Sequence, residues 1–327
     1  MKRRRFITVL GGAAAWPLAG YAQQSEQVRR VGVLMDRPEN DPIARASVAA
    51  LGKALADLGW VEGKNIRIDY RFAASDPTLF KTYAAELVGL SPDAILASST
   101  PGLAAVREQT RTIPIVFVNV SDPLDQGFVQ SLARPGGNIT GFTDADAPVL
   151  GKWLQLLKDV VPSITRVGVI FNPGNPALDL YNRAIEAAAP SLGMMVTLAP
   201  VHDDAGIEEA VATQAREPNG ALIALPSAFN AAHGDAMIAA ATRHRLPLMS
   251  GSAITRAGGL MTYWMDVVAL YAQAAPYIDR ILNGASAADL PVQQPTRYKL
   301  IINLKTAKAI GLTVPPAMLD LADEVIE

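Results

Sequence analysis

Residues 30–34 read Arg30-Val31-Gly32-Val33-Leu34, and residues 166–170 repeat the pattern as Arg166-Val167-Gly168-Val169-Ile170. Each run is a short apolar segment that predicts a buried strand, and each opens a series in which apolar runs alternate with helical patterns. Strands that alternate with helices predict a parallel sheet covered by helices on both faces. Two such series in one chain therefore predict an α/β protein with two similar lobes.

The first series is expected to contain five strands and four helices. Its strands are expected at residues 31–35, 65–72, 94–97, 115–118 and 138–142, and its helices at 43–58, 79–90, from 101 and, as a short helix, from 124. The strand at 65–72 alternates apolar and polar residues, which is typical of a half-buried edge strand. The helix at 43–58 ends before Gly59, a common residue after a helix C-terminus.

The second series repeats this order, and the tail returns elements to both lobes. Helices are expected at residues 150–160, 177–189, 207–215 and 231–243, with strands at 167–171, 195–198, 221–225 and 248–249. The tail adds a strand at 260–263, a helix at 267–282, a strand at 298–303 and a helix at 305–310. A chain that crosses between two lobes more than once makes a hinge and a closing cleft. We expect one lobe at 28–143 plus 265–295 and the other at 144–264 plus 296–327.

Composition excludes several classes of function. The 327 residues carry a net charge of −2, with 50% apolar and 18% charged residues and no cysteine. A large buried core is expected, and no basic face for nucleic acid is indicated. Without cysteine the chain has no disulfides and no lipidated cysteine that would tether it to a membrane. There is no G-x-S-x-G, Walker or H-E-x-x-H motif, and we expect no enzyme activity, cofactor or metal site.

The N-terminal residues have the pattern of a secretory leader. Arg3–Arg5 precede an uncharged segment from Phe6 to Leu18, and the small residues Gly20 and Ala22 stand just before Gln23. This order predicts a signal peptide, residues 1–22, cleaved near Ala22. The paired arginines favour twin-arginine export. The apolar run is shorter than the ~20 residues of a membrane span. An uncleaved anchor helix is the alternative.

Polar residues follow the predicted strands of the first lobe. Ligands of open α/β sheets bind outside the carboxyl ends of the strands. Ser99, Thr100 and Pro101 follow the third strand, with Thr100 placed as an N-cap and Pro101 as the first helical residue, a helix start that suits a carboxylate. Asn119, Ser121 and Asp122 follow the fourth strand. Asp122 either accepts a hydrogen bond from a ligand or caps the next helix.

The second lobe has polar and aromatic residues at the equivalent strand ends. They are Asn172, Ser227, Phe229, Ser250 and Tyr263. Phe229 would form an apolar wall of a ligand site or cover a helix start, and Tyr263 would hydrogen-bond a ligand or its own backbone. Hydroxyl and amide groups with few charges suit a small polar ligand. The histidines do not indicate a metal site. His233 and His244 are eleven residues apart, a poor spacing for metal ligands, and His202 with Asp203 is expected in a turn and helix cap.

Four segments together resemble one known family. They are the leader at 3–24, LGWVEGKNIRIDYRFA at 58–73, the stretch from IPIVFVNVSDP to NITGFT at 113–143, and LPVQQPTRYKLIIN to the final ADEVIE at 290–327. The chain resembles the ABC-transporter substrate-binding proteins that were long described as a domain of unknown function, with relatives that bind tryptophan or other aromatic amino acids. Trp264 follows Tyr263 at a position where members of the family usually have glycine, and Trp153 stands where many relatives have a basic residue.

The resemblance implies a type I periplasmic-binding fold of two flavodoxin-like, doubly wound lobes with three crossovers. It also implies a ligand carboxylate at Ser99-Thr100-Pro101 and a cleft lined by Asn119, Asp122, Asn172, Ser227 and Tyr263.

The expected function is that of a periplasmic, monomeric solute-binding protein. It would bind an amino acid or a related carboxylate and present it to the permease and ATPase of an importer. A ligand sensor for a chemoreceptor or two-component system and an exported enzyme are the alternatives.

Overall fold

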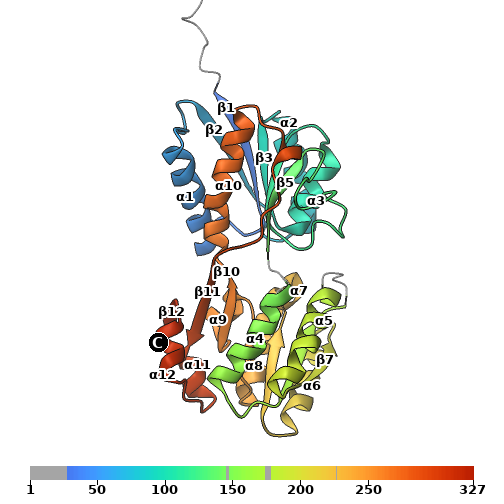
Figure 1. The fold of residues 1–327 in the computed structure, drawn as a ribbon, viewed down its shortest axis with the longest axis vertical. Coiled ribbons are helices and arrows are strands. Elements are labelled where there is room, and N and C mark those ends of the chain that lie inside the picture. The colour runs from blue at the N-terminus through green and yellow to red at the C-terminus, as the bar shows by residue number, and fades with distance from the viewer. Residues whose placement is uncertain (1–27, 145–146, 174–177, 226) are drawn as a thin grey trace, which may run out of the picture.

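A computed structural model gives the structure of the protein and describes residues 28–144, 147–173, 178–225 and 227–327. The chain forms two α/β lobes, each built on its own sheet, and passes between them three times (Figure 1). The predicted two-lobed α/β fold is therefore confirmed.

The first lobe contains a five-stranded parallel sheet in the order β2-β1-β3-β4-β5. Its strands are β1 (Arg29–Met35), β2 (Ile66–Phe72), β3 (Ala94–Ser98), β4 (Ile115–Val120) and β5 (Ile139–Thr143). Its helices are α1 (Pro42–Asp57), α2 (Pro77–Gly89), α3 (Ser99–Gln109) and α10 (Val267–Leu282). Helices α1 and α10 cover one face and α2 and α3 the other (Figure 1), so residues of the tail complete the first lobe.

The second lobe contains a seven-stranded sheet in the order β12-β11-β10-β9-β8-β6-β7. Its strands are β6 (Arg166–Phe171), β7 (Met195–Pro200), β8 (Gly220–Ala224), β9 (Leu248–Met249), β10 (Met261–Met265), β11 (Tyr298–Asn303) and β12 (Glu324–Ile326). Its helices are α4 (Ala147–Val160), α5 (Leu178–Ala188), α6 (Asp204–Ala215), α7 (Ala228–Ala232), α8 (Gly234–Arg243), α9 (Ser252–Ala257), α11 (Leu304–Ala309) and α12 (Pro316–Leu321). Strand β11 runs antiparallel to β10, and the other neighbouring strands are parallel.

The apolar run of β1 forms a central strand because both of its faces are buried. Val31 and Val33 are fully buried in the core that also contains α1 and α10, whereas Leu34 is fully buried on the opposite face beside α2 and α3. Continuous apolar runs are typical of strands in parallel sheets covered by helices on both sides.

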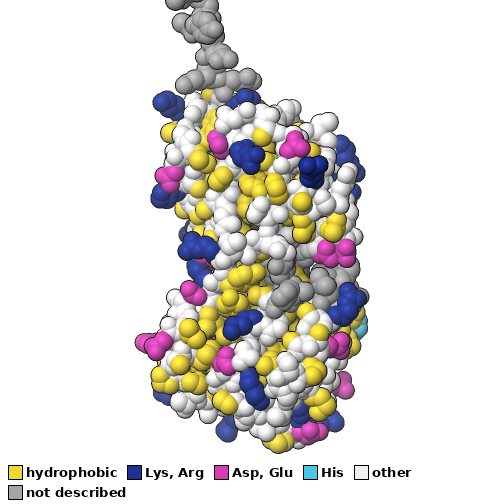
Figure 2. Space-filling model, in the orientation of Figure 1, with side chains coloured by type: hydrophobic (Ala, Val, Ile, Leu, Met, Phe, Trp, Pro, Cys, Tyr) yellow, Lys and Arg dark blue, Asp and Glu magenta, His cyan; other side chains and the backbone are white. Residues whose placement is uncertain are grey.

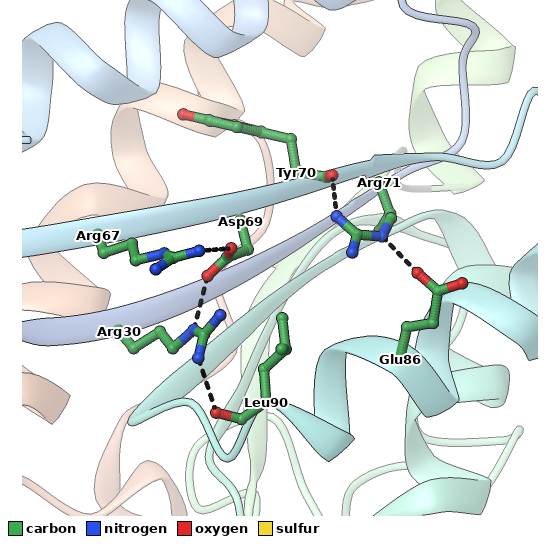
Figure 3. Close-up of polar contacts among 7 residues, drawn as sticks. All are labelled: Arg30, Arg67, Asp69, Tyr70, Arg71, Glu86 and Leu90. Atoms are coloured by element: carbon green, nitrogen blue, oxygen red, sulfur yellow. Dashed lines mark hydrogen bonds and ion pairs between the residues drawn. The ribbon is translucent and has the colours of Figure 1, made fainter.

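The edge strand β2 is held by charged pairs on one of its faces (Figure 3). Asp69 accepts hydrogen bonds from Arg30 of β1 at 2.7 Å and from Arg67 at 3.3 Å, and Arg71 pairs with Glu86 of α2 at 2.6 Å. The hydrogen bond from Arg30 lowers the pKa of Asp69 below its ordinary value, against the opposing effect of burial. Alternation of polar and apolar residues thus predicted the edge position correctly.

Strand β5 approaches β4 at a glycine. Gly141 has φ +151°, and a Cβ there would lie 2.1 Å from the carbonyl oxygen of Phe117. A side chain at this position is therefore excluded by the backbone of the neighbouring strand.

Two predicted helices differ from the structure. Residues 123–127 form turns, closed by hydrogen bonds such as Phe128 N to Pro123 O at 2.9 Å, so the expected short helix from Leu124 is wrong. The preceding Asp122 has φ +40°, which turns the chain away from a helical start. The expected helix at 231–243 is divided at His233 into α7 and α8. Within the described residues, no helix combines the length and the apolar character that a membrane span requires.

Candidate ligand-binding site

The carboxyl edges of the two sheets face one another. Strand β5 ends at Thr143 and the chain enters α4 of the second lobe, while β10 ends at Met265 and the chain enters α10 of the first lobe. Because β1, β3 and β4 run parallel to β5, and β6, β8 and β9 run parallel to β10, the carboxyl ends of all these strands point to the opposite lobe. Ligands of open parallel sheets bind at this edge.

The start of α3 differs from the prediction. The helix begins at Ser99, so the expected N-cap role of Thr100 is wrong, and Pro101 is the third residue of the helix rather than its first. Ser98 stands at the N-cap position without capping the helix, because its Oγ donates to Asp36 Oδ1 at 2.7 Å. Thr100 Oγ1 accepts from the backbone N–H of Ser121 at 3.2 Å and so joins the ends of β3 and β4.

Three of the predicted site residues in the first lobe have an unfavourable backbone conformation. Ser99, Asn119 and Asp122 have φ values of +68°, +60° and +40°. Each such residue costs of order 1–3 kcal/mol, and residues of this kind cluster at ligand sites. Asn119 also lies at a register shift between Val118 and Val120. Asp122 Oδ1 accepts from the backbone N–H of Asp125 at 3.2 Å and so closes a turn, whereas the helix that it was expected to cap does not form.

A carboxylate between the lobes is bound from both sides. Ser121 Oγ of the first lobe donates to Asp144 Oδ2, and the hydroxyl of Tyr181, on α5 of the second lobe, lies 3.3 Å from both carboxylate oxygens. Tyr181 is buried. Burial raises its pKa well above the ordinary value, and the negative charge of Asp144 raises it further. Through Asp144, Ser121 of the first lobe and Tyr181 of the second lobe are connected at the first crossing of the chain.

At the second carboxyl edge, the predicted side chains are engaged within their own lobe. Asn172 Nδ2 donates to the carbonyl of Val201 at 3.0 Å. Ser227 caps α7, where its Oγ accepts from Asn230 N at 3.0 Å. Asn230 donates to backbone carbonyls at the ends of β6 and β8 and so holds these two strand ends together.

The aromatic residue Phe229 covers the start of α7. Its ring is half-buried, packs against the neighbouring core and lies 4.2 Å from the ring of His233, centroid to centroid. This observation favours the helix-cover alternative over a free apolar wall.

Ser250 and Tyr263 lie beside the hinge. Ser250 is fully buried, and its backbone N–H donates to Met261 O. The ring of Tyr263 stacks on that of Tyr298 at 5.3 Å, and its carbonyl accepts from the indole N–H of Trp153 at 2.6 Å. Trp153 is fully buried and packs edge-on against Trp264, so the two departures from the family pattern form one contact.

Other candidate chemistry lies away from the facing edges. His233 pairs with Asp204 at 2.6 Å and His244 lies 3.3 Å from Glu208, both on α6. Asp203 caps α6 through Gly206 N, as predicted. Among the described residues, no three His, Cys, Asp or Glu side chains form a group that would hold a metal. A cavity of about 260 Å³ lies within the second lobe between β6, β7 and α6, and none of the predicted site residues lines it.

Sequence reasoning missed the groups that lie next to the predicted residues. Asp36 and Asp144 directly follow β1 and β5, so reading the residue after every strand would have found both. Tyr181 and Tyr271 are on helices, where an apolar period assigns an aromatic side chain to the core, and no local signal distinguishes them.

Comparison with known proteins agrees with this geometry. Residues 38–326 match the family described as ABC transporter substrate binding protein. A tyrosine-binding protein of Clostridioides difficile (strain R20291) is 27% identical over 301 residues, which cover 88% of this chain and 82% of that protein.

Solved structures have the same fold. A conserved domain protein from Vibrio cholerae O1 biovar El Tor is 28% identical, with a TM-score of 0.80 over 91% of this chain and 100% of that one. The ligand-free, open structure of a substrate-binding protein with adhesive properties from Clostridium difficile is 25% identical, with a TM-score of 0.76 over 91% and 99%. An ABC domain from Streptococcus pneumonia in complex with L-Trp is 23% identical, and its TM-score of 0.79 over 91% and 99% shows the shared fold.

The match covers most of the chain, and the two-lobed α/β architecture is that of periplasmic binding proteins. The family binds substrates and does not transform them, which removes the alternative of an exported enzyme. The chain belongs to the family of ABC transporter substrate-binding proteins.

Proposed function

We propose that this protein binds an amino acid between its two lobes and delivers it, as a monomer, to the permease and ATPase of an ABC importer. The observation that carries the proposal is the opposition of two carboxyl edges across a hinge that the chain crosses three times. Two lobes joined in this way close around a ligand, and the ligand favours closure by the difference between its affinities for the closed and open forms.

The start of α3 is the proposed receptor for the ligand carboxylate. The helix has 11 residues, and its first turn presents backbone N–H groups with the hydroxyls of Ser99 and Thr100 beside them. Such a helix start favours negative charge. The positive φ of Ser99 and of Asn119 supports a ligand role, because both residues lie at the carboxyl ends of β3 and β4, where ligands of parallel sheets bind.

The nature of the ligand follows from relatives and from the chemistry of the edge. The relative from Clostridioides difficile is named a tyrosine-binding protein. Hydroxyl, amide and carboxylate groups at the facing edges suit a small zwitterion better than a sugar phosphate or a nucleic acid. Amino acids are therefore the proposed class, with no cofactor required.

The proposed moving bodies are residues 28–143 with 265–295, and residues 144–264 with 296–327. The hinge between them includes the contact of Asp266 N with Arg297 O at 3.0 Å and the ion pair of Asp266 with Lys299 at 2.9 Å. These contacts join two of the crossing segments, so we expect them to persist while the lobes open and close.

The location is proposed to be periplasmic. The leader at residues 1–22 lies outside the described residues, and export with cleavage near Ala22 follows from its sequence alone. Determination of the N-terminal sequence of protein recovered from the periplasm tests it. A mature chain that begins near Gln23 supports export and cleavage, and a chain that retains Arg3–Arg5 contradicts them.

A thermal-shift screen of the mature protein with the twenty L-amino acids tests the binding proposal. A ligand at 100 times its dissociation constant adds about 2.7 kcal/mol to the free energy of unfolding. Thr100→Ala should weaken the strongest hit by about 1–3 kcal/mol, since a buried polar partner loses a hydrogen bond. Thr82→Ala on the exposed surface of α2 is the matched control. A screen in which no amino acid raises the melting temperature refutes the proposed class of ligand.

A further inference from the structure

A second polar group lies beside the proposed carboxylate receptor. Asp36 directly follows β1, and its Oδ1 accepts from the fully buried Ser98 hydroxyl at 2.7 Å. Its backbone carbonyl accepts from Ser75 N at 2.6 Å. Ser98 therefore holds the carboxylate of Asp36, and Ser75 holds its backbone.

The carboxylate of Asp36 is outside the ion pairs that the described residues form. The neighbouring Arg37 pairs with Asp41 at 3.3 Å instead, and no ion pair to Asp36 occurs in the part of the chain that the structure describes. Asp36 is half-buried. A carboxylate that is oriented by a hydrogen bond and has no ion pair is available to a positive group of a ligand.

A hydroxyl with unused hydrogen-bonding capacity lies next to this carboxylate. Tyr271, near the start of α10, is fully buried, and within the described residues its hydroxyl has no hydrogen-bond partner. Tyr271 packs in the same core cluster as Met35, the last residue of β1, which directly precedes Asp36. Burial raises the pKa of Tyr271 above the ordinary range and the charge of Asp36 raises it further, whereas the Ser98 hydroxyl and the charge of Arg37 lower it. A buried hydroxyl without a partner costs about 1–3 kcal/mol unless a ligand or water satisfies it.

The two subsites lie within the span of one amino acid. Strands β1 and β3 are parallel neighbours with Leu34 opposite Ala97, so Asp36 stands beside the start of α3. Neighbouring strands are about 4.8 Å apart. Asp36 as a receptor for an ammonium group and the start of α3 as a receptor for a carboxylate therefore match the adjacent charged groups of an α-amino acid.

We propose that Asp36, oriented by Ser98, binds the α-ammonium group of the ligand, and that Tyr271 contributes its hydroxyl to the same subsite. This inference rests on the proposed function and sharpens it: the protein selects zwitterionic α-amino acids over carboxylic acids that lack the amino group. Asp36 and Tyr271 are thereby specificity-determining residues of the first lobe.

Calorimetry with paired ligands tests the proposal. The probes are L-tyrosine with 3-(4-hydroxyphenyl)propionate and L-leucine with 4-methylpentanoate, where each second compound lacks only the amino group. The native protein should bind at least one amino acid about 10- to 100-fold more tightly than its partner compound. In Asp36→Asn this preference should disappear, because the amino acid loses affinity and the des-amino compound does not. The asparagine keeps an oxygen that accepts from Ser98, so the fold should be unchanged.

Two further variants separate a binding role from a structural one. Asp57→Asn removes an equal charge from the exposed end of α1 and should leave both affinities unchanged. Tyr271→Phe removes a hydroxyl that has no hydrogen-bond partner among the described residues, so the free energy of unfolding should stay equal or rise while amino-acid affinity falls.

The outcomes distinguish this proposal from the function on which it rests. Equal loss of affinity for both members of a pair in Asp36→Asn, or no loss for either, overturns the role of Asp36 and leaves amino-acid binding intact. Binding of the des-amino compounds as tightly as the amino acids by the native protein also overturns it. Failure of the native protein to bind any of the twenty amino acids refutes the proposed function itself.

Discussion

Tyr181→Phe tests whether the two lobes are coupled through Asp144. The hydroxyl of Tyr181 comes from the second lobe, while Asp144 follows the last strand of the first lobe and is also bound by Ser121. Removing the hydroxyl leaves the packed ring in place and deletes its polar contact with Asp144, the residue at which the chain leaves the first lobe. The variant should close less readily around its ligand.

The magnitude follows from the geometry. A hydrogen bond to a charged group contributes about 1.5–3 kcal/mol. The two distances from the Tyr181 hydroxyl to Asp144 are 3.3 Å, longer than the ~2.8 Å typical of hydroxyl donors, so the lower end applies. A loss of about 1.4 kcal/mol is tenfold in an equilibrium constant. Affinity for the strongest amino-acid ligand should therefore fall by about tenfold.

The assay combines calorimetry of ligand binding with urea unfolding and small-angle X-ray scattering of the ligand-free protein. Tyr277→Phe is the matched control, because the Tyr277 hydroxyl donates to Pro291 O at 2.6 Å beside the first-lobe sheet. Both variants should lose unfolding free energy, but only Tyr181→Phe should lose affinity and expand in scattering. Equal ligand affinities in the two variants, with no difference in scattering, would refute the coupling of the lobes through this contact.

Three other changes probe the fold. Trp153→Phe should lower the free energy of unfolding by about 2 kcal/mol in urea titrations, because a backbone carbonyl of β10 loses its partner and a buried void is left; a change below 0.5 kcal/mol contradicts this. Asp69→Asn should destabilise the protein at pH 7 by about 1–2 kcal/mol through loss of the pair with Arg30. Since the folded pKa of Asp69 is lowered, its contribution is complete above the unfolded pKa of about 3.9 and is lost as pH falls through the folded value, so the gap between native protein and variant should shrink below pH 4 in urea titrations; a gap that stays constant down to pH 3 contradicts the assignment. Gly141→Ala should lower the free energy of unfolding by more than 3 kcal/mol in thermal and urea unfolding. Gly52→Ala, in a helix with open space around it, should raise this free energy by about 0.5–1 kcal/mol. Similar effects of the two substitutions would contradict the close approach of β5 to β4.

The sequence predicts well those elements whose cause is local. The long helix at 267–282 has the predicted bounds because Asp266 caps its start and Asn283-Gly284 end it. The strand at 298–303 is likewise found as predicted. In both, apolar period and end signals lie within the segment itself, so no distant residue is needed to choose the conformation.

The candidate site was predicted by position rather than by contact. Thr100 was assigned to the helix cap from its place before Pro101, but in the folded chain its hydroxyl accepts from Ser121 and the true N-cap residue turns to Asp36. Local rules rank one partner for each hydroxyl, whereas the fold offers several from other strands. The positive φ of Asp122 is unexpected from sequence for the same reason, since glycine is the residue that local rules expect there.

The two facing edges differ in how the polar side chains at their strand ends are hydrogen-bonded, and this difference bears on which lobe contacts the ligand. In the second lobe, Asn172 donates to the carbonyl of Val201, and Ser227 accepts from the backbone N–H of Asn230. In the first lobe, and within the described residues, Asp36 forms no ion pair and the Tyr271 hydroxyl has no hydrogen-bond partner. Ser99, Asn119 and Asp122, at the same edge, have positive φ. Among the described residues, buried polar atoms without a hydrogen-bond partner also occur in the second lobe, at Asn182, Asn230, Thr255 and Thr262. What distinguishes Asp36 is its position at the carboxyl end of β1, where ligands of parallel sheets bind. Under the proposed function the first lobe therefore supplies most of the ligand's polar contacts, and the second lobe supplies closure through contacts such as that of Tyr181 with Asp144.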